Sequence, residues 1–472
     1  MAIMLDSANI LGTSLPIFGV FWILLGLFII RRTPQHRVAG VLMVAAGALS
    51  AGIFVYLSTG TGGRSPINLD LKQLANLFLP SVVPVLLASV VSYIIYQLAG
   101  RLSGKSSLAF GLLAVLGIGV YSAAIIFWLI TNVKPSGIYI RDEALKLTTY
   151  DDAVVRAPTA MALGPHGELY VAGIGGKIWE LQDKDADGKA DNSNEFAQGL
   201  IQPEGLAWYE DGLYVNEIGR LLFMRDTDGD GIADDTKVIF DQFPTKEEIH
   251  PNHQNNGVAV GPDGRIYVGS GSTTDRFEEE HPYAAGIFSM NPDGSDVRTY
   301  ATGLRNPFAF VPAPGGGFFA VDNGSSGCIT SITEKDMSEG ELNCPEKIYV
   351  PEEVNYVTEG GDYGFPHYFG IPLQDSGTLP PMVTFGEHMA TTGIVLYEGD
   401  QMPAYKGQLF VSFWSAGQVY TVRFFKIDDQ HYTGDTRLLI EGIAGPTAMI
   451  NAPDGGIYIG SFFTNTIYHL GN

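Results

Sequence analysis

The sequence predicts an N-terminal transmembrane domain of four helices, residues 1–134, followed by an all-β six-bladed propeller, residues 135–472. Three observations support this prediction: four long apolar runs, a hairpin-like unit that recurs, and a sharp difference in charge between the two parts. The first part contains 8 Lys and Arg against 2 Asp and Glu, whereas the whole chain has a net charge of −23. The second part is therefore strongly acidic, which argues against a nucleic-acid partner.

The four apolar runs cover about residues 10–30, 38–57, 77–98 and 108–130, and none contains a charged residue. Each has the length of about 20 residues that an α-helix needs to cross a bilayer. The first run is followed closely by further runs, so a cleaved signal peptide alone does not explain it. We therefore expect a multi-pass protein of the cytoplasmic membrane.

The basic residues of the connecting loops predict the orientation. The loops between helices one and two and between helices three and four contain five: Arg31, Arg32, Arg37, Arg101 and Lys105. The opposite side has three: Arg64, Lys72 and Lys134. The positive-inside rule places the first group in the cytoplasm and the propeller outside it. Cys328 and Cys344, the only two cysteines, would then form a disulfide in an oxidising compartment or remain two unrelated thiols.

A unit of about 45 to 55 residues recurs in the acidic part. Each copy has a small residue, a short apolar run, a turn such as Pro-Asp-Gly and an alternating strand, which predicts a hairpin. The copies begin near residues 158, 203, 255, 305, 391 and 445. Six four-stranded units favour a six-bladed propeller over a β-sandwich, which would not explain the repeat. Residues 324–381 would be an insertion.

The innermost strand of each blade borders a central channel, so the residues that begin these strands should face a shared cavity. These residues are polar: Thr159, Glu204, Asn255, Asn256, Arg305, Asn306, Thr392 and Thr447. Polar groups that converge from distant positions in a sequence are what a binding site requires.

Two acidic loops, DKDADGKAD (183–191) and DTDGDGIAD (226–234), have the DxDxDG spacing of a calcium loop, with Gly at position six for the sharp turn. The predicted carboxylate ligands are Asp183, Asp185, Asp187, Asp191, Asp226, Asp228, Asp230 and Asp234. Position twelve is Asn194 or Lys237 instead of Glu, which predicts weak sites suited to millimolar calcium. The alternative is an acidic hairpin without a metal.

Four stretches of the propeller together resemble the glucose/sorbosone dehydrogenase family of quinoproteins. They are HQNNGVAVGPDGRIYVGSGS (253–272), GLRNPFAF (303–310), EEVNYVTEGGDYGFP (352–366) and TTGIVLYEGDQMPAYKGQLFVSF (391–413). The resemblance covers most of residues 150–472. It implies a six-bladed propeller that binds pyrroloquinoline quinone (PQQ) with calcium and oxidises a sugar or related aldehyde.

The resemblance also implies roles for individual residues. His253 matches the general base, and a histidine suits this role because its pKa lies near neutral pH. Arg305 and Asn306 match residues that contact the quinone, and Glu204 and Asn256 would be further polar contacts to the cofactor. The alternative reading is that His253 is a surface-loop histidine and Arg305 a structural ion pair.

The chain departs from this family at two positions. The turn of the fifth blade, SFWSAGQ (412–418), contains no basic residue, and Gly445 stands before Pro446 where the family has Arg. No apolar run contains a histidine, which excludes a bis-His haem. Electrons would therefore pass directly to a membrane quinone, or else the helices only anchor the propeller.

Two other functions are compatible with the sequence. A propeller that has lost catalysis could bind carbohydrate or a protein partner at the cell surface. A calcium-dependent, lactonase-like hydrolase could hold a channel metal at Glu204, Asn256 and Asn306, and that metal would activate water.

Overall fold

The computed structural model describes residues 137–472, apart from 250–252, 254, 326–349, 371–375 and 388. The chain divides into two units, Met1–Ser136 and Gly137–Asn472. The four predicted transmembrane helices and both cysteines lie outside the described residues. Among the described residues, no helix is long and apolar enough to cross a membrane. The one described helix is the 3₁₀ turn η2 (Pro403–Tyr405).

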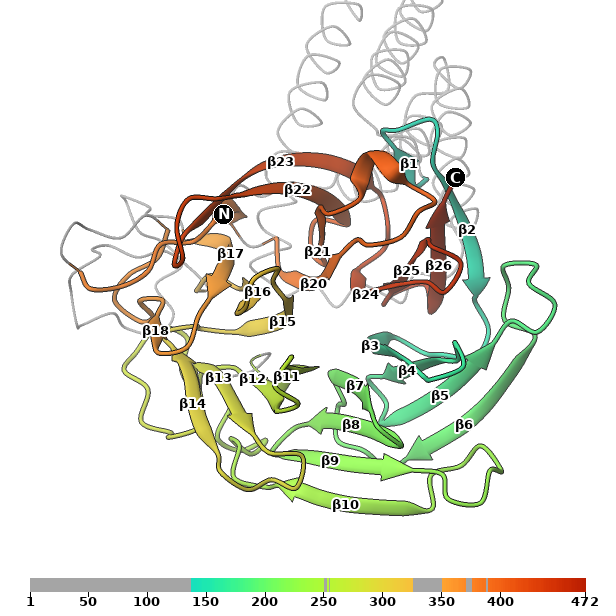
Figure 1. Ribbon diagram of the computed structural model, residues 1–472, viewed down its shortest axis with the longest axis horizontal. Coiled ribbons are helices and arrows are strands. Elements are labelled where there is room, and N and C mark those ends of the chain that lie inside the picture. Colours follow the sequence, from blue (N-terminus) through green and yellow to red (C-terminus); the bar gives the residue numbers. More distant parts are fainter. Residues whose placement is uncertain (1–136, 250–252, 254, 326–349, 371–375, 388) are drawn as a thin grey trace, which may run out of the picture. The chain divides into compact units, whose positions relative to one another are not determined.

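Six sheets, antiparallel apart from one edge strand, form the described unit (Figure 1), which confirms the predicted six-bladed propeller. Blade one contains β3 (Pro158–Leu163), β4 (Leu169–Gly173), β5 (Lys177–Gln182) and β6 (Asn192–Gln198). Blade two contains β7 (Gly205–Tyr209), β8 (Gly212–Glu217), β9 (Arg220–Arg225) and β10 (Asp235–Phe240). Blade three contains β11 (Asn255–Val260), β12 (Ile266–Ser270), β13 (Gly286–Met290) and β14 (Arg298–Thr302), with the short parallel strand β18 (Gly361–Asp362) at its edge.

The second half of the ring follows the same plan. Blade four contains β15 (Pro307–Pro312), β16 (Phe318–Asp322), β17 (Pro351–Val357) and β19 (Val383–Glu387). Blade five contains β20 (Thr391–Leu396), β21 (Leu409–Phe413), β22 (Gln418–Lys426) and β23 (Tyr432–Glu441), with β1 (Tyr139–Ile140) at its edge. Blade six contains β24 (Pro446–Asn451), β25 (Ile457–Ser461), β26 (Thr466–Gly471) and β2 (Lys146–Asp151).

The predicted insertion at 324–381 needs correction, because it includes the third strand of blade four. β17 pairs with β16 from Glu353 to Val357 and with β19 on its other side, so blade four is complete only when this segment is counted as part of it. β18, in the same range, extends blade three.

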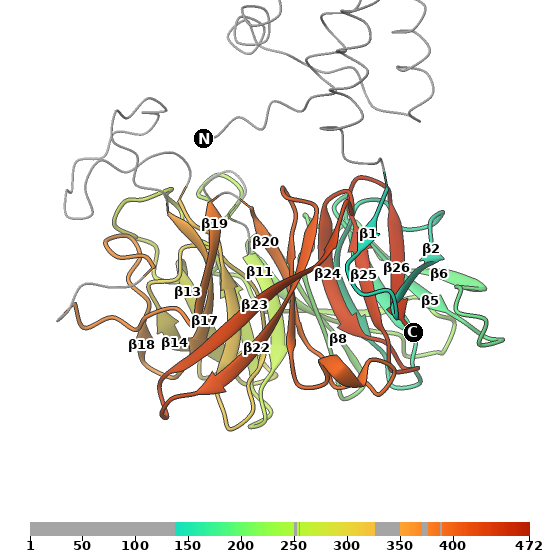
Figure 2. The same ribbon diagram turned by 90° about the horizontal axis from the view of Figure 1, so that it is seen from above.

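The ring closes because the two ends of the unit share one sheet. β2, from the N-terminal side, pairs with β26, the last strand of the chain, and becomes the outer strand of blade six. The six innermost strands contact one another around the centre, from β3 through β7, β11, β15 and β20 to β24 and back to β3. Figure 2 shows the blades from the side, with β11 and β20 toward the middle of the ring.

The core lies between the blades. The second strand of every blade is buried along its full length, as its Tyr, Phe and β-branched residues lead one to expect. Six apolar clusters fill the spaces between blades, and each draws residues from two neighbouring blades. Each blade therefore buries its apolar faces only against its neighbours, which makes the closed ring the stable arrangement.

Candidate active site

The candidate active site lies at the mouth of the channel where the inner strands begin. His253 precedes β11, Glu204 precedes β7, and Arg305 with Asn306 precedes β15. All four side chains are at least 95% buried. An added Cβ at Gly205 would lie 2.4 Å from Asn256 O, so the blade-two residues pack directly against those of blade three. The inner strands also enclose a channel pocket of about 380 Å³.

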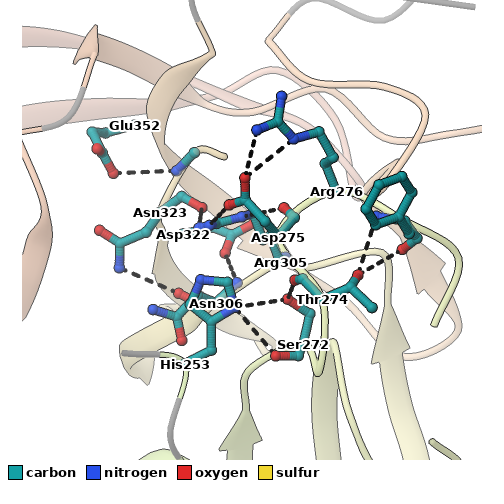
Figure 3. Close-up of polar contacts among 12 residues, drawn as sticks. His253, Ser272, Thr274, Asp275, Arg276, Arg305, Asn306, Asp322, Asn323 and Glu352 are labelled. Carbon is teal, nitrogen blue, oxygen red and sulfur yellow. Dashed lines mark hydrogen bonds and ion pairs between the residues drawn. The ribbon is translucent and has the colours of Figure 1, made fainter. Parts of the chain in front are cut away.

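His253 is oriented by Ser272 (Figure 3). Its Nδ1 lies 3.0 Å from Ser272 Oγ and 3.2 Å from the Ser272 carbonyl oxygen. The Ser272 hydroxyl donates its hydrogen to the Thr274 carbonyl, and a carbonyl oxygen can only accept. The hydrogen between His253 and Ser272 must therefore come from Nδ1. In the neutral imidazole this leaves the lone pair on Nε2.

Gly271 brings His253 and Asn306 together. An added Cβ at this residue would lie 2.7 Å from Asn306 Oδ1, 2.8 Å from His253 O and 2.9 Å from His253 Cβ. Asn256 Nδ2 donates to Asn306 Oδ1 at 2.7 Å, and Asn306 N donates to Asp322 Oδ1 at 2.6 Å. Asn306 is thus held from both sides beside the imidazole. Asn256 Oδ1 is a buried oxygen without a hydrogen-bond donor, which the channel metal of the hydrolase alternative would explain.

Arg305 is tied into the protein by its whole guanidinium group. Nε donates to Asp275 O at 2.8 Å and Nη1 donates to Asn323 O at 3.0 Å, while Nη2 pairs with the Asp275 carboxylate. Arg276 pairs with the other oxygen of Asp275 at 3.1 Å. Both arginines and Asp275 are buried, so the structural ion pair weighed as the alternative for Arg305 is present. Sequence reasoning missed Asp275 and Arg276, and their only local signal is an acid and a base in succession after GSGS.

Three buried carboxyl groups lie beside this ion-pair cluster. Burial raises the pKa of Asp322 to about 6, of Glu352 to about 7 and of Glu353 to about 8. Main-chain N–H groups of Arg305 and Asn306 donate to Asp322 and oppose this effect. The sequence indicated Glu352 and Glu353 only as part of the family-like stretch, because burial is not visible in a sequence.

The threonines predicted to face the channel lie at the seams between blades, and Thr159 and Thr392 also line the channel pocket. Each donates from Oγ1 to the carbonyl of a proline that begins the next blade's inner strand or lies two residues before it. The pairs are Thr159 with Pro203 at 2.6 Å, Thr392 with Pro446 at 2.7 Å, and Thr447 with Pro158 at 2.9 Å. These hydroxyls stabilise the ring. The side chain of Asn255 lies outside the described residues.

The two acidic loops bring together six of the eight predicted ligands. Oxygens of Asp183, Asp185 and Asp187 lie within 4.8 Å of one another, as do those of Asp226, Asp228 and Asp234. The other two, Asp191 and Asp230, accept main-chain hydrogen bonds within their loops. Asp183 Oδ1 is a buried oxygen without a hydrogen-bond donor, which fits a cation ligand. Gly188 and Gly231, at position six, have φ of 85° and 87°, as the turn requires.

Each acidic loop also crosses a seam at the outer rim. Ala190 N donates to Tyr150 O of blade six at 2.9 Å, and Ala233 N donates to Phe196 O of blade one at 2.8 Å. Both alanines occupy position eight of their loops. The loops therefore connect blades one and two to the blade before them, which supports a structural role.

These features define a class: a six-bladed propeller with a histidine and two buried asparagines at the channel mouth. Solved structures share the fold. The holo PQQ domain of pyranose dehydrogenase from Coprinopsis cinerea is 13% identical with a TM-score of 0.58, covering 72% of this chain and 98% of its own. The PQQ-bound aldose sugar dehydrogenase from Streptomyces coelicolor is 17% identical with a TM-score of 0.54, covering 71% and 99%.

A third structure is the apo form of soluble aldose sugar dehydrogenase from Escherichia coli, 16% identical with a TM-score of 0.54, covering 69% of this chain and 99% of its own. At these identities the likeness shows the fold alone. No curated protein matches the chain. Residues 141–471 match a family described as a domain of unknown function (DUF7133), and the chain belongs to that family.

Proposed function

We propose that the propeller is a quinoprotein-type dehydrogenase that oxidises a hydroxyl group of a sugar or of a hydrated aldehyde, with His253 as the general base. The observation that carries this proposal is the Ser272 contact, which fixes the imidazole hydrogen on Nδ1 and the lone pair on Nε2. A surface-loop histidine would not need such a contact, nor would it be 97% buried.

The residues act in defined ways in this proposal. The substrate hydroxyl gives its proton to His253 Nε2 while the C–H bond breaks, a C=O bond forms and a hydride leaves with two electrons. Asn306, fixed by Asn256 and the Asp322 carboxylate, lies beside the imidazole and borders the place where the substrate would bind. PQQ, when bound, would supply the two-electron acceptor.

The residues present could contact PQQ near blades three and four but not near blades five and six. Of the two quinone contacts that the resemblance implies, Asn306 lies beside His253, whereas the Arg305 guanidinium is bound to Asp275 and Asn323. The side near blades five and six lacks cations, because residues 412–418 contain none and an added Cβ at Gly445 would lie 2.8 Å from Phe463 Cδ2 and 3.0 Å from Trp414 Nε1. The three carboxylates of PQQ would thus have fewer charged partners here than in the family it resembles.

The proposal also includes two calcium sites and a membrane anchor. We assign calcium to the two acidic loops, as structural sites that need millimolar ion because position twelve is not Glu. We also propose that four helices within residues 1–134 anchor the propeller outside the cytoplasmic membrane. A membrane quinone would then be the nearest electron acceptor, if the helices do more than anchor.

A PQQ titration of the full-length protein in millimolar calcium tests the function, with aldoses and a dye acceptor to measure turnover. We expect wild type and His253→Gln both to bind PQQ stoichiometrically, and turnover of the variant to fall by about 10²-fold or more, because a general base contributes about that factor. His367→Gln, at an exposed imidazole paired with Glu278, is the matched control and should turn over normally. Absence of PQQ binding, or full turnover by His253→Gln, would contradict the proposal.

A further inference from the structure

The two positions where cations are missing meet at one place in the ring. Trp414 directly follows β21, whose end pairs with the start of β20 through Phe413 and Thr391. Phe462 and Phe463 follow β25, whose end pairs with the start of β24 through Ser461 and Pro446. The three aromatic residues therefore lie on the face where the inner strands begin, which is the face of His253.

The three rings form one cluster. The centroids of Trp414 and Phe463 are 4.8 Å apart, those of Phe462 and Phe463 are 5.3 Å apart, and those of Trp414 and Phe462 are 5.9 Å apart. Phe463 is nevertheless 60% exposed, although it lies in a well-packed blade. A large aromatic side chain left open beside a channel mouth is a typical binding feature.

Gly445 shows that this arrangement excludes a basic side chain. Its φ is +67°, a conformation that side chains disfavour, and the rings of Phe463 and Trp414 occupy the space a Cβ would need. An arginine at this position, which the quinoprotein resemblance implies, therefore cannot be accommodated without moving the cluster. The aromatic rings take the place of the cation.

The chain segments that carry and border the rings have no charged residues. The segments 412–418, 442–447 and 461–466 contain no Asp, Glu, Lys or Arg, in a chain that has 79 such residues. Hydroxyl groups border the rings instead: Ser415 and Thr464 are exposed, and Thr464 Oγ1 donates to Ser461 Oγ at 2.7 Å. Aromatic rings bordered by hydroxyl groups suit a ligand with one apolar C–H face and neutral hydrogen-bonding groups at its edge.

We propose that Trp414, Phe462 and Phe463, here called the aromatic platform, bind an uncharged carbohydrate ring by stacking at the channel mouth. That this ring is the substrate oxidised at His253 rests on the proposed function. That the platform binds a carbohydrate ring does not depend on it, because stacking needs neither PQQ nor the general base.

Binding of neutral trisaccharides to the full-length protein without PQQ tests the platform. Maltotriose and cellotriose are the probes, with trigalacturonic acid as a charged comparison and menadione as a flat ring without hydroxyl groups. We expect Trp414→Ala and Phe463→Ala each to weaken trisaccharide binding about tenfold, since an aromatic contact is worth about 0.5–1.5 kcal/mol beyond its buried area and tenfold is about 1.4 kcal/mol. Calorimetry measures both affinities.

Phe425→Ala is the matched control, because Phe425 is a 42% exposed phenylalanine on β22 of the same blade as Trp414. It should bind trisaccharide like wild type. The proposal is overturned if wild type binds neither neutral trisaccharide, if Phe463→Ala binds as well as wild type, or if trigalacturonic acid or menadione binds more tightly. The protein could also bind trisaccharide through the platform but fail to bind PQQ. That result would support the proposed role of the aromatic platform and contradict the proposed dehydrogenase activity.

Discussion

Gly271 lies between the two side chains on which the proposed chemistry depends. The absence of a Cβ lets His253 and Asn306 approach from neighbouring blades. The sequence shows a glycine in GSGS but not what it faces. Its role follows from the packing of β12 against the start of blade four, where Ser272 N also donates to Arg305 O at 2.8 Å.

Gly271→Ala should reduce turnover by about tenfold or more and lower the free energy of unfolding by about 1–3 kcal/mol, the usual cost of overpacking. The added methyl group would displace both His253 and Asn306, and a small displacement of reacting groups is costly in rate. Steady-state kinetics and thermal unfolding of the same sample measure the two effects. Gly175→Ala is the control, because nothing lies within 4 Å of a Cβ at that glycine. Equal turnover of the two variants would contradict the assigned role.

At the scale of elements, the acidic loops have a sequence pattern that shapes a local turn and also joins two blades. Their DxDxDG spacing determines the turn and gathers the carboxylates. The hydrogen bonds from Ala190 to Tyr150 and from Ala233 to Phe196 give that turn a second purpose, since they join neighbouring blades. A cation in either loop would therefore stabilise a seam as well as a turn.

Removing calcium with a chelator should lower the thermal unfolding temperature of the full-length protein. At calcium tenfold above its Kd, each loop would contribute about 1.4 kcal/mol to the free energy of unfolding. Asp183→Asn should remove part of this calcium-dependent increase, and Asp152→Asn, at an exposed aspartate, should leave it intact. An unfolding temperature independent of calcium would show that the loops are acidic hairpins without a metal.

At the scale of the whole molecule, closure of the ring depends on β2. This strand lies outside the recurring unit in the sequence, yet it completes blade six beside the last strand of the chain. Tyr150 on β2 is 3% exposed, and its ring centroid is 4.5 Å from that of Tyr458. The apolar cluster that contains both rings also contains Leu169 and Val171 of blade one.

Tyr150→Ala should lower the free energy of unfolding by about 3 kcal/mol, the usual cost of removing a buried aromatic ring. The loss falls at the seam where the two ends of the ring meet, so denaturation should remain a single transition at lower denaturant. Tyr139→Ala serves as the control, since Tyr139 is 58% exposed on β1. If the free energy of unfolding of Tyr150→Ala fell by less than about 1 kcal/mol, packing of β2 would not be what stabilises the closed ring.

The number of blades, most of their strands and the two acidic loops could be predicted from the sequence, because strand alternation and turn chemistry depend on neighbouring residues. The sequence also indicated His253, Asn256 and Asn306 through a family resemblance. Only the tertiary structure decided that β2 closes blade six and that β17 belongs to blade four. It alone placed Arg305 in an ion pair with Asp275 and replaced the expected cations by an aromatic platform. These features join residues far apart in the chain, and burial and partners become defined only when the ring closes.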